Sequence, residues 1–264
     1  MKSWRRPPGL SKLLTQAVSG KHKPTAFVLA GHNGSGKTTL WNERLAPQLQ
    51  IPLINADRIT ASILPPADAT SGQLPQWARK LRDNDARWQI LSQAGVQAFI
   101  GLVMEREMPF AFETVFSHWK KLPDGRVESK ADIIKRLQAA GYFVVLLFVG
   151  LSAAELSVLR VETRKEQGGH GVPLNKLNSR FPRTQRAIGY AAPIADMTLM
   201  FDNSRTPDKA FALVRAQRGK HILFDCRDPQ YILDRSLRAV ARLWLEKVTG
   251  PYKSARLDKT PLQD

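Results

Sequence analysis

Cysteine is nearly absent from the sequence, since Cys226 is the single one among 264 residues. One cysteine cannot form an internal disulfide, which is typical of a reducing compartment, and its place at the end of a predicted strand favours a role in packing. Long apolar runs are absent too. None reaches the roughly 18 residues of a membrane span, and no apolar stretch of a secretion signal follows the basic segment 1–8. We therefore expect a soluble, cytoplasmic protein.

The sequence also lacks a Gly/Ser-rich linker, an internal repeat and a low-complexity tract. A chain of this length can form one large α/β domain or two small ones. Without a linker, one domain over residues 1–264 is favoured, with a basic N-terminal arm over 1–24 and a strand–helix extension over 206–264. The Pro-bearing polar stretch 65–75 is interpreted as a loop within that domain.

Acidic residues are scarce: 23 Asp and Glu stand against 40 Lys and Arg, which leaves a formal charge of +17. Such a charge favours anionic partners, namely nucleotides, nucleic acid or an acidic protein, without choosing among them. The basic residues are spread along the whole chain, and no RNA-binding signature with interleaved aromatic residues accompanies them. A solvated basic surface and a partner-binding surface both stay open as interpretations.

A glycine-rich loop gives the clearest functional signal. The stretch "FVLAGHNGSGKTTLW" at 27–41 contains the G-x-x-x-x-G-K-[ST] pattern between a predicted strand and a predicted helix. Backbone N–H groups of such a loop and the following helix N-terminus cradle a polyphosphate. We expect Lys37 to reach the β- and γ-phosphates of ATP and the Thr38 hydroxyl to bind Mg²⁺. The predicted cradle comprises Gly31, Asn33, Gly34, Ser35, Gly36, Lys37, Thr38 and Thr39. The alternative is a glycine-rich turn with an incidental lysine.

Hydrophobic patterning predicts strands that alternate with helices. The strands are expected over 26–30, 52–55, 109–113, 142–150, 197–202 and 221–225. The helices are expected over 37–49, 77–107, 130–140, 153–166, 174–191, 207–218 and 229–248. This alternation predicts an α/β fold of the P-loop NTPase and kinase kind, a mainly parallel sheet with helices on both faces. Ligands of such a fold bind outside the carboxyl ends of the strands.

Two acidic residues follow predicted strands at that edge. Asp57, in "INADRI", is a candidate general base that would accept the proton of an attacking hydroxyl, or else an N-cap of the helix that follows. Glu113, in "FAFETVFS", would orient a substrate hydroxyl or complete the shell of Mg²⁺, with Thr114 and Ser117 as hydrogen-bonding neighbours. His118 is interpreted as a surface or partly buried histidine.

The segment 160–183, "RVETRKEQGGHGVPLNKLNSRFPR", joins an Arg-rich helix end, a glycine-rich turn and a second helix opened by Pro173. It is interpreted as an Arg-rich lid. Arginines at 160, 164, 180 and 183 would fold over the phosphates and neutralise charge in the transition state, as an arginine finger does. Alternatively, they are solvated helix faces around a flexible loop.

Four segments together resemble the zeta toxin family of P-loop kinases: "AGHNGSGKTTL", "INADRI", "FAFETVFS" and "GGHGVPLNKLNSRFPR" with "LMFDNS" at 199–204. The resemblance implies an ATP-dependent phosphotransferase of a toxin–antitoxin system. Known relatives phosphorylate a sugar hydroxyl of UDP-N-acetylglucosamine. By the same resemblance, Asp57 acts as base and contacts the acceptor with Glu113, Thr114 and Ser117. Lys37, Arg164 and Arg180 take part in catalysis, and Arg183 contacts ATP phosphates.

The segment "RITASIL" after Asp57 differs from the Phe-Arg continuation of the best-known toxins, so the acceptor pocket differs as well. Two other functions stay open from the sequence. One is a kinase of a nucleoside, polynucleotide or other metabolite, which the positive charge favours. The other is a P-loop NTPase that phosphorylates no acceptor. An acidic antitoxin protein would suit the basic surface.

Overall fold

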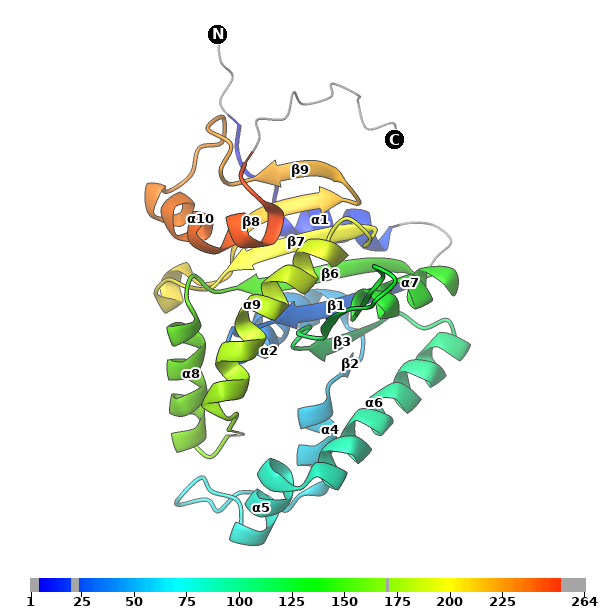
Figure 1. Ribbon diagram of the computed structural model, residues 1–264, viewed down its shortest axis with the longest axis vertical. Helices are drawn as coiled ribbons and strands as arrows, with labels where there is room; N and C mark the ends of the chain where they lie inside the picture. The colour runs from blue at the N-terminus through cyan, green and yellow to red at the C-terminus, as the bar shows by residue number, and fades with distance from the viewer. Residues whose placement is uncertain (1–4, 20–23, 170, 253–264) are drawn as a thin grey trace.

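The computed structural model describes residues 5–19, 24–169 and 171–252, and its centre is a seven-stranded sheet (Figure 1). The strand order is β2-β3-β1-β6-β7-β8-β9. The first five strands are parallel to one another, whereas β8 and β9 run antiparallel to their neighbours. The strands are β1 (Thr25–Gly31), β2 (Leu53–Ile54), β3 (Phe110–Thr114), β6 (Phe143–Gly150), β7 (Met197–Asp202), β8 (Ala212–Arg218) and β9 (His221–Asp225). The mainly parallel α/β fold predicted from the sequence is confirmed.

Strand β1 lies in the middle of the sheet and carries the phosphate loop at its carboxyl end. All seven of its residues are buried, because β3 and β6 pair with it on both edges and helices cover both faces. Strands buried in this way read as continuous apolar runs, which is why the sequence pattern identifies them. Six predicted strands are found, each within one residue of its expected bounds at either end.

Helices cover both faces of the sheet (Figure 1). In that view α7, α9 and α10 lie in front of the sheet, α1 and α2 behind it, and α4 to α6 extend from the edge beside β2. The helices are α1 (Leu10–Val18), α2 (Lys37–Leu40), α3 (Ala46–Leu49), α4 (Ala56–Ile63), α5 (Gln76–Asn84), α6 (Ala86–Glu105), α7 (Ala131–Ala139), α8 (Ala154–Glu166), α9 (Leu174–Ala191) and α10 (Arg235–Thr249). No helix within the described residues is long and apolar enough to cross a membrane.

The long helix predicted over 77–107 is two helices. Asp85 separates α5 from α6 in an extended conformation, and its carboxylate accepts a hydrogen bond of 2.8 Å from the backbone N–H of Trp88. Aspartate is a preferred N-cap, so a helix start within the apolar pattern is explained by one side chain. The helix predicted over 37–49 forms, with a π-helical turn at Trp41–Leu45 between α2 and α3.

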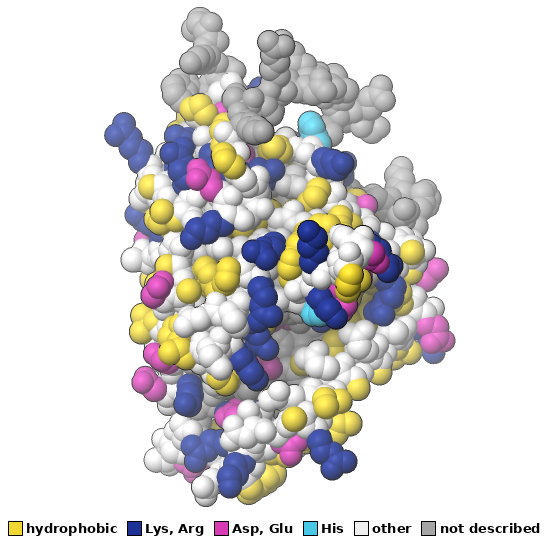
Figure 2. Space-filling model, in the orientation of Figure 1, with side chains coloured by type: hydrophobic (Ala, Val, Ile, Leu, Met, Phe, Trp, Pro, Cys, Tyr) yellow, Lys and Arg dark blue, Asp and Glu magenta, His cyan; other side chains and the backbone are white. Residues whose placement is uncertain are grey.

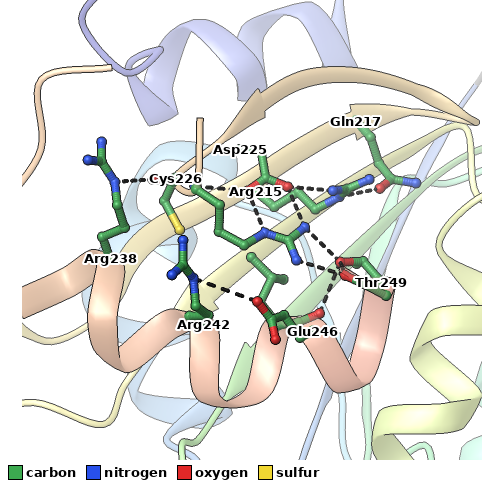
Figure 3. Close-up of polar contacts among 11 residues, drawn as sticks. Arg215, Gln217, Asp225, Cys226, Arg238, Arg242, Glu246 and Thr249 are labelled. Carbon is green, nitrogen blue, oxygen red and sulfur yellow. Dashed lines mark hydrogen bonds and ion pairs between the residues drawn. The ribbon is translucent and has the colours of Figure 1, made fainter. Parts of the chain in front are cut away.

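The helix predicted over 207–218 is wrong. Only Pro207–Lys209 form a 3₁₀ turn, and residues from Ala212 onward form β8, which pairs with both β7 and β9. The segment contains helix-forming Ala, Arg and Gln, but Arg215 is buried there and pairs with Asp225 of β9 (Figure 3). Pairing across the sheet and burial override local propensity here. The extension after residue 206 therefore completes the sheet.

One helix and one two-stranded hairpin have no counterpart in the prediction. Helix α1 lies within the predicted N-terminal arm, and it buries Leu13, Leu14 and Ala17 in the core. The strands β4 (Trp119–Lys121) and β5 (Val127–Ser129) form a separate antiparallel hairpin. Of the arm's basic residues, Lys2, Lys21 and Lys23 lie outside the described residues.

Candidate active site

The phosphate loop, residues 31–38, follows β1 at the point where the chain leaves the middle of the sheet. Strands β3 and β2 lie to one side of it, and β6 and β7 to the other. The carboxyl ends of these five parallel strands therefore meet around the loop. In an open α/β sheet this edge is where ligands bind.

Two glycines of the loop occupy conformations that other residues rarely adopt. Gly34 has φ +68° and Gly36 has φ +89°. A Cβ atom at Gly36 would lie 2.6 Å from Nδ2 of Asn203, and one at Gly34 would lie 3.0 Å from the carbonyl oxygen of Ser157. The loop is thus held between β7 and α8 with no room for side chains at these positions, a geometry that suits the predicted phosphate cradle of backbone N–H groups.

Lys37 is buried at the start of α2, with 7% of its surface exposed. Its ammonium donates hydrogen bonds to the carbonyl oxygens of His32 at 2.9 Å and Gly31 at 3.2 Å, so it lies across the loop. Burial lowers the pKa of Lys37 from its usual value, while the nearby carboxylates of Glu113 and Asp57 raise it and Arg164 lowers it further. A buried cation beside backbone donors is suited to bind phosphate.

Glu113, at the end of β3, contacts three of the site's residues. Its Oε2 accepts hydrogen bonds from the Thr38 hydroxyl at 2.8 Å and from Nδ2 of Asn55 at 2.7 Å, and its Oε1 lies 3.8 Å from Nζ of Lys37. This arrangement favours the magnesium role of Glu113 over the hydroxyl-orienting one, because it orients the threonine that would bind the ion.

These residues fit a magnesium ion that is held together with a nucleotide. No cluster of three or more His, Cys, Asp and Glu side chains suited to a metal exists among residues 5–19, 24–169 and 171–252. Magnesium in phosphoryl-transfer sites does not need such a cage, since one or two protein oxygens bind it along with substrate phosphates and water. The Thr38 hydroxyl and the Glu113 carboxylate would supply those oxygens.

Asp57 lies in the first turn of α4, with its side chain exposed. It does not cap the helix: the N-cap is Asn55, whose Oδ1 accepts a hydrogen bond of 3.1 Å from the backbone N–H of Arg58. The alternative interpretation of Asp57 as a helix cap is therefore wrong. Its carboxylate is near enough to raise the pKa of Lys37, so it faces the same edge of the sheet.

Thr114 is the last residue of β3 and Ser117 lies in the turn that follows, and both are half-buried. The Thr114 hydroxyl accepts a 3.4 Å hydrogen bond from the backbone N–H of Phe116, which has φ +62°. The neighbouring carbonyl of Val115 accepts a 3.4 Å hydrogen bond from Thr184 of α9. The turn thus links β3 to α9 beside Glu113.

The predicted lid corresponds to α8, α9 and the turn between them, in which His170 lies outside the described residues. Three arginines approach the phosphate loop. Arg160 packs against Gly34, Arg164 acts electrostatically on Lys37, and Arg180 lines a small pocket with His32 and Asn33. Arg183 is different, because its guanidinium donates to the Ser179 carbonyl and hydroxyl on its own helix, at 2.9 and 3.2 Å.

Two residues that support the phosphate loop were not predicted. Nδ2 of Asn203 donates a 2.8 Å hydrogen bond to the carbonyl oxygen of Ser35, and its place directly after a strand in "LMFDNS" was the available signal. The His32 ring stacks on Phe181 of α9 with 3.8 Å between ring centroids. Burial, and secondly the charge of Lys37, lower the pKa of His32 to about 3. The loop is thus packed directly against α9.

Solved structures with a similar fold include two of a complex named AvrRxo1-ORF1:AvrRxo1-ORF2, one with sulphate ions and one with ATP. Each has a TM-score of 0.55 and 18% identity, and the likeness covers 91% of this chain and 84% of the other. The PezAT toxin–antitoxin system of Streptococcus pneumoniae also matches, at 14% identity and a TM-score of 0.49, over 93% of this chain and 87% of the other. At these identities the likeness shows the fold alone.

No curated protein matches the sequence. The sequence profile of the zeta toxin family does match it, over residues 11–206, which include the phosphate loop, Asp57, Glu113 and the lid. The match and the P-loop kinase fold together support an ATP-dependent kinase or toxin. The chain belongs to the zeta toxin family.

Proposed function

We propose that the protein transfers the γ-phosphate of ATP to a hydroxyl of a small molecule, with UDP-N-acetylglucosamine as the first acceptor to test, and that it acts as a toxin. The hydrogen bond from Thr38 to Glu113 beside the buried Lys37 carries this proposal. Lys37 supplies a cation for the phosphates, and Thr38 supplies an oriented hydroxyl for Mg²⁺ at the same place.

In the proposed reaction, bound ATP with Mg²⁺ supplies the phosphoryl group. The acceptor oxygen forms a bond to the γ-phosphorus, the bond from that phosphorus to the β,γ-bridging oxygen breaks, and ADP leaves. Lys37 stabilises the charge that develops on the transferred group and on the bridging oxygen. The phosphate-loop N–H groups hold the β-phosphate, so the protein mainly positions the reactants and offsets charge.

Asp57 is the proposed general base. The acceptor hydroxyl gives its proton to the Asp57 carboxylate as the bond to phosphorus forms. The side chain is exposed in the first turn of α4, on the same side of the phosphate loop as Glu113. An exposed carboxylate can receive a proton from a substrate and release it to solvent. Asn55 supports this role by fixing the start of α4 and by bonding Glu113.

Arg164 and Arg180 are the proposed cations of the lid. Burial lowers the pKa of Arg180, as does the neighbouring charge of Arg183, so this guanidinium is partly desolvated next to the phosphate loop. A desolvated cation that gains a phosphate partner stabilises a charged transition state. Arg183 would have to leave Ser179 in order to reach ATP.

The acceptor is proposed from family membership. Relatives act on the sugar hydroxyl of a nucleotide sugar, and Thr114 and Ser117 offer hydroxyl groups for such a substrate in the turn beside Glu113. The test is mass spectrometry of purified protein with ATP, Mg²⁺ and UDP-N-acetylglucosamine, run beside Asp57→Asn and the control Asp124→Asn. Asp124 is exposed and pairs with Arg126 in the β4–β5 turn.

A gain of one phosphoryl group with the wild type and the control, reduced on the order of 10²- to 10⁴-fold in Asp57→Asn, would support the assignment. An unmodified sugar nucleotide would exclude this acceptor and direct the search to nucleosides, polynucleotides and other metabolites. If ATP is consumed at the same rate by Asp57→Asn and no acceptor is modified, the protein is a P-loop NTPase instead.

An antitoxin is the proposed protein partner. By its name, the AvrRxo1-ORF1:AvrRxo1-ORF2 structure is of a complex of two gene products, and the charge of +17 on this chain suits an acidic partner. Copurification with the product of an adjacent small reading frame, with loss of ATP binding in the complex, would support it. The absence of a stable complex would contradict it.

A further inference from the structure

Helix α9 carries an unusual distribution of charge. Its 18 residues include Lys176, Arg180, Arg183 and Arg186 and no aspartate or glutamate. These four residues are spaced by four, three and three positions, so they lie within about one third of the helix circumference. Lys176, Arg183 and Arg186 are exposed, and Arg180 is half-buried.

This row of cations has no counter-charge in the described part of the chain. None of the four residues forms an ion pair with a carboxylate there. The carboxylates of Glu155 and Glu162 on α8 lie in a groove with Leu174 and Asn178, on the other flank of α9. Like charges three and four residues apart destabilise a helix, so the row is a cost to the free protein that an anionic ligand would relieve.

The row passes the phosphate loop and ends beside a pair of aromatic residues. Arg180, the second residue of the row, lines the pocket with His32 and Asn33 of the loop, and beyond Arg186 Tyr190 lies on the same helix face as Arg183 and Arg186. The Tyr190 ring packs edge-on against Trp119 of β4, with 5.3 Å between centroids. Lys120 and Lys121 follow on β4, both exposed, while Lys135 of α7 lies over the Tyr190 ring. Figure 2 shows Lys and Arg side chains in a line over α9, beside a hollow on this face.

We propose that this surface, the α9 row with Tyr190 and the β4 lysines, binds the backbone of a single-stranded nucleic acid. From Lys176 to Arg186 the row spans about 15 Å along the helix, which is longer than one diphosphate group and suits two or three successive phosphates. Repeated cations next to an aromatic ring are common features of surfaces that bind single strands. The bases of a nucleic acid can in addition stack on an aromatic ring, which the carboxylates of an acidic protein cannot do.

This inference does not depend on phosphotransfer. It concerns a ligand bound along α9 and β4, beside the ATP site, and it would stand if UDP-N-acetylglucosamine were not the acceptor. The test variant is accordingly the double substitution Lys176→Gln and Arg186→Gln, at two residues with no proposed role in the kinase reaction. The matched control is Lys12→Gln with Arg44→Gln, which removes the same charge from exposed positions in α1 and the turn Trp41–Leu45, on the other side of the sheet.

The experiment is fluorescence anisotropy of the full chain with a labelled 12-nucleotide RNA and the equivalent DNA, between 50 and 200 mM salt. For single strands each phosphate contact contributes roughly 0.7 to the slope of log affinity against log salt. The α9 double variant should therefore lose about 1.4 from that slope and bind on the order of ten-fold more weakly at 150 mM salt. The control should bind as the wild type does, and kinase activity should not change in either.

Three results would overturn the proposal. The first is that the wild type binds neither strand at 150 mM salt. The second is that the control pair weakens binding as much as the α9 pair. The third is equal binding of polyglutamate and RNA, with neither changed by Tyr190→Leu, which would identify a surface for acidic proteins. A difference between RNA and DNA would show whether the 2′-hydroxyl is recognised.

Discussion

Glu113 is the residue on which most contacts of the site depend. Its carboxylate receives hydrogen bonds from Thr38 of α2 and from Asn55 at the start of α4, and it lies next to the ammonium of Lys37, also of α2. The end of β3 is joined in this way to α2 and to the start of α4. One carboxylate thus orients both the residue proposed to bind Mg²⁺ and the segment that carries Asp57.

Replacing Glu113 by Gln should lower phosphotransfer on the order of 10²- to 10³-fold, because an electrostatic contact in the transition state is lost. The variant should also need a higher Mg²⁺ concentration for half-maximal activity, which a magnesium titration of ATP turnover would measure. Glu128→Gln, at an exposed position of β5, is the control. An unchanged magnesium requirement would contradict the role of Glu113 in positioning the ion.

His32 links the phosphate loop to the lid without hydrogen bonds from its ring to any described residue. It is 2% exposed, stacked on Phe181 and edge-on to Phe148. An uncharged ring is required there, since protonation would bury a cation beside Lys37. The pKa of about 3 in the folded protein, against 6.5 normally, expresses this cost.

The free energy of unfolding should therefore fall as the pH is lowered between the pKa of His32 in the unfolded chain and its pKa in the folded protein. The unfolded chain takes up the proton first, so the contribution of the neutral ring is complete above about pH 6.5 and is lost progressively down to about pH 3. Denaturant unfolding should show a loss approaching about 1.4 kcal/mol per pH unit that is absent in His32→Phe. The exposed His118→Phe should keep the wild-type dependence, and an equal slope in His32→Phe would contradict the assignment.

At the scale of elements, β8 shows where sequence patterns are insufficient. Its helix-forming residues become a strand because a buried cluster holds it in the sheet, and Figure 3 shows Asp225 beside Arg215, facing Thr249 of α10. The Asp225 carboxylate pairs with Arg215 and accepts two hydrogen bonds from the Arg227 guanidinium, at 2.7 and 2.9 Å, and one from the Arg227 backbone N–H at 3.0 Å. Arg227 in turn donates to Thr249 of α10 at 2.9 Å. Two guanidinium groups thus share one buried carboxylate.

Replacing Asp225 by Asn should destabilise the protein by about 3 to 5 kcal/mol, because two buried arginines would lose their only acidic partner in the cluster. Thermal or denaturant unfolding would measure it. Asp124→Asn, which breaks an exposed pair with Arg126, should barely change stability. A similar small effect for Asp225→Asn would mean that water or neighbouring carbonyls satisfy the arginines.

At the scale of the whole molecule, the phosphate loop and six strands could be predicted from the sequence because their signals are local. The apolar run of β1 and the glycine spacing after it need no partner to be recognised. Contacts between distant segments could not be predicted, such as the stacking of His32 on Phe181 or the bond from Asn203 to Ser35. The helix predicted over 207–218 failed for the same reason, since only Asp225 explains a buried Arg215 in a strand.

Other long-range contacts, made by α10, show that the chain after residue 206, beyond the family match, belongs to the fold. Trp244 of α10 is fully buried, its Nε1 donates a 2.8 Å hydrogen bond to Asp202 at the end of β7, and its ring packs edge-on against Phe148. Gly150 leaves room for it, because a Cβ there would lie 2.6 Å from the indole ring. Residues after 206 thus support two strands that end beside the phosphate loop.

A chain ended at residue 206 should therefore fail to fold cooperatively, although it retains the whole family match. It would expose the edge of β7 and the apolar surface under α10, which circular dichroism and size-exclusion chromatography would detect as lost thermal transition and aggregation. A chain ended at residue 252, which keeps every described element, is the control. Trp244→Ala in the full chain should cost about 3 to 5 kcal/mol for the same reason. A cooperative transition in the 206-residue chain would instead make β8, β9 and α10 a separable addition.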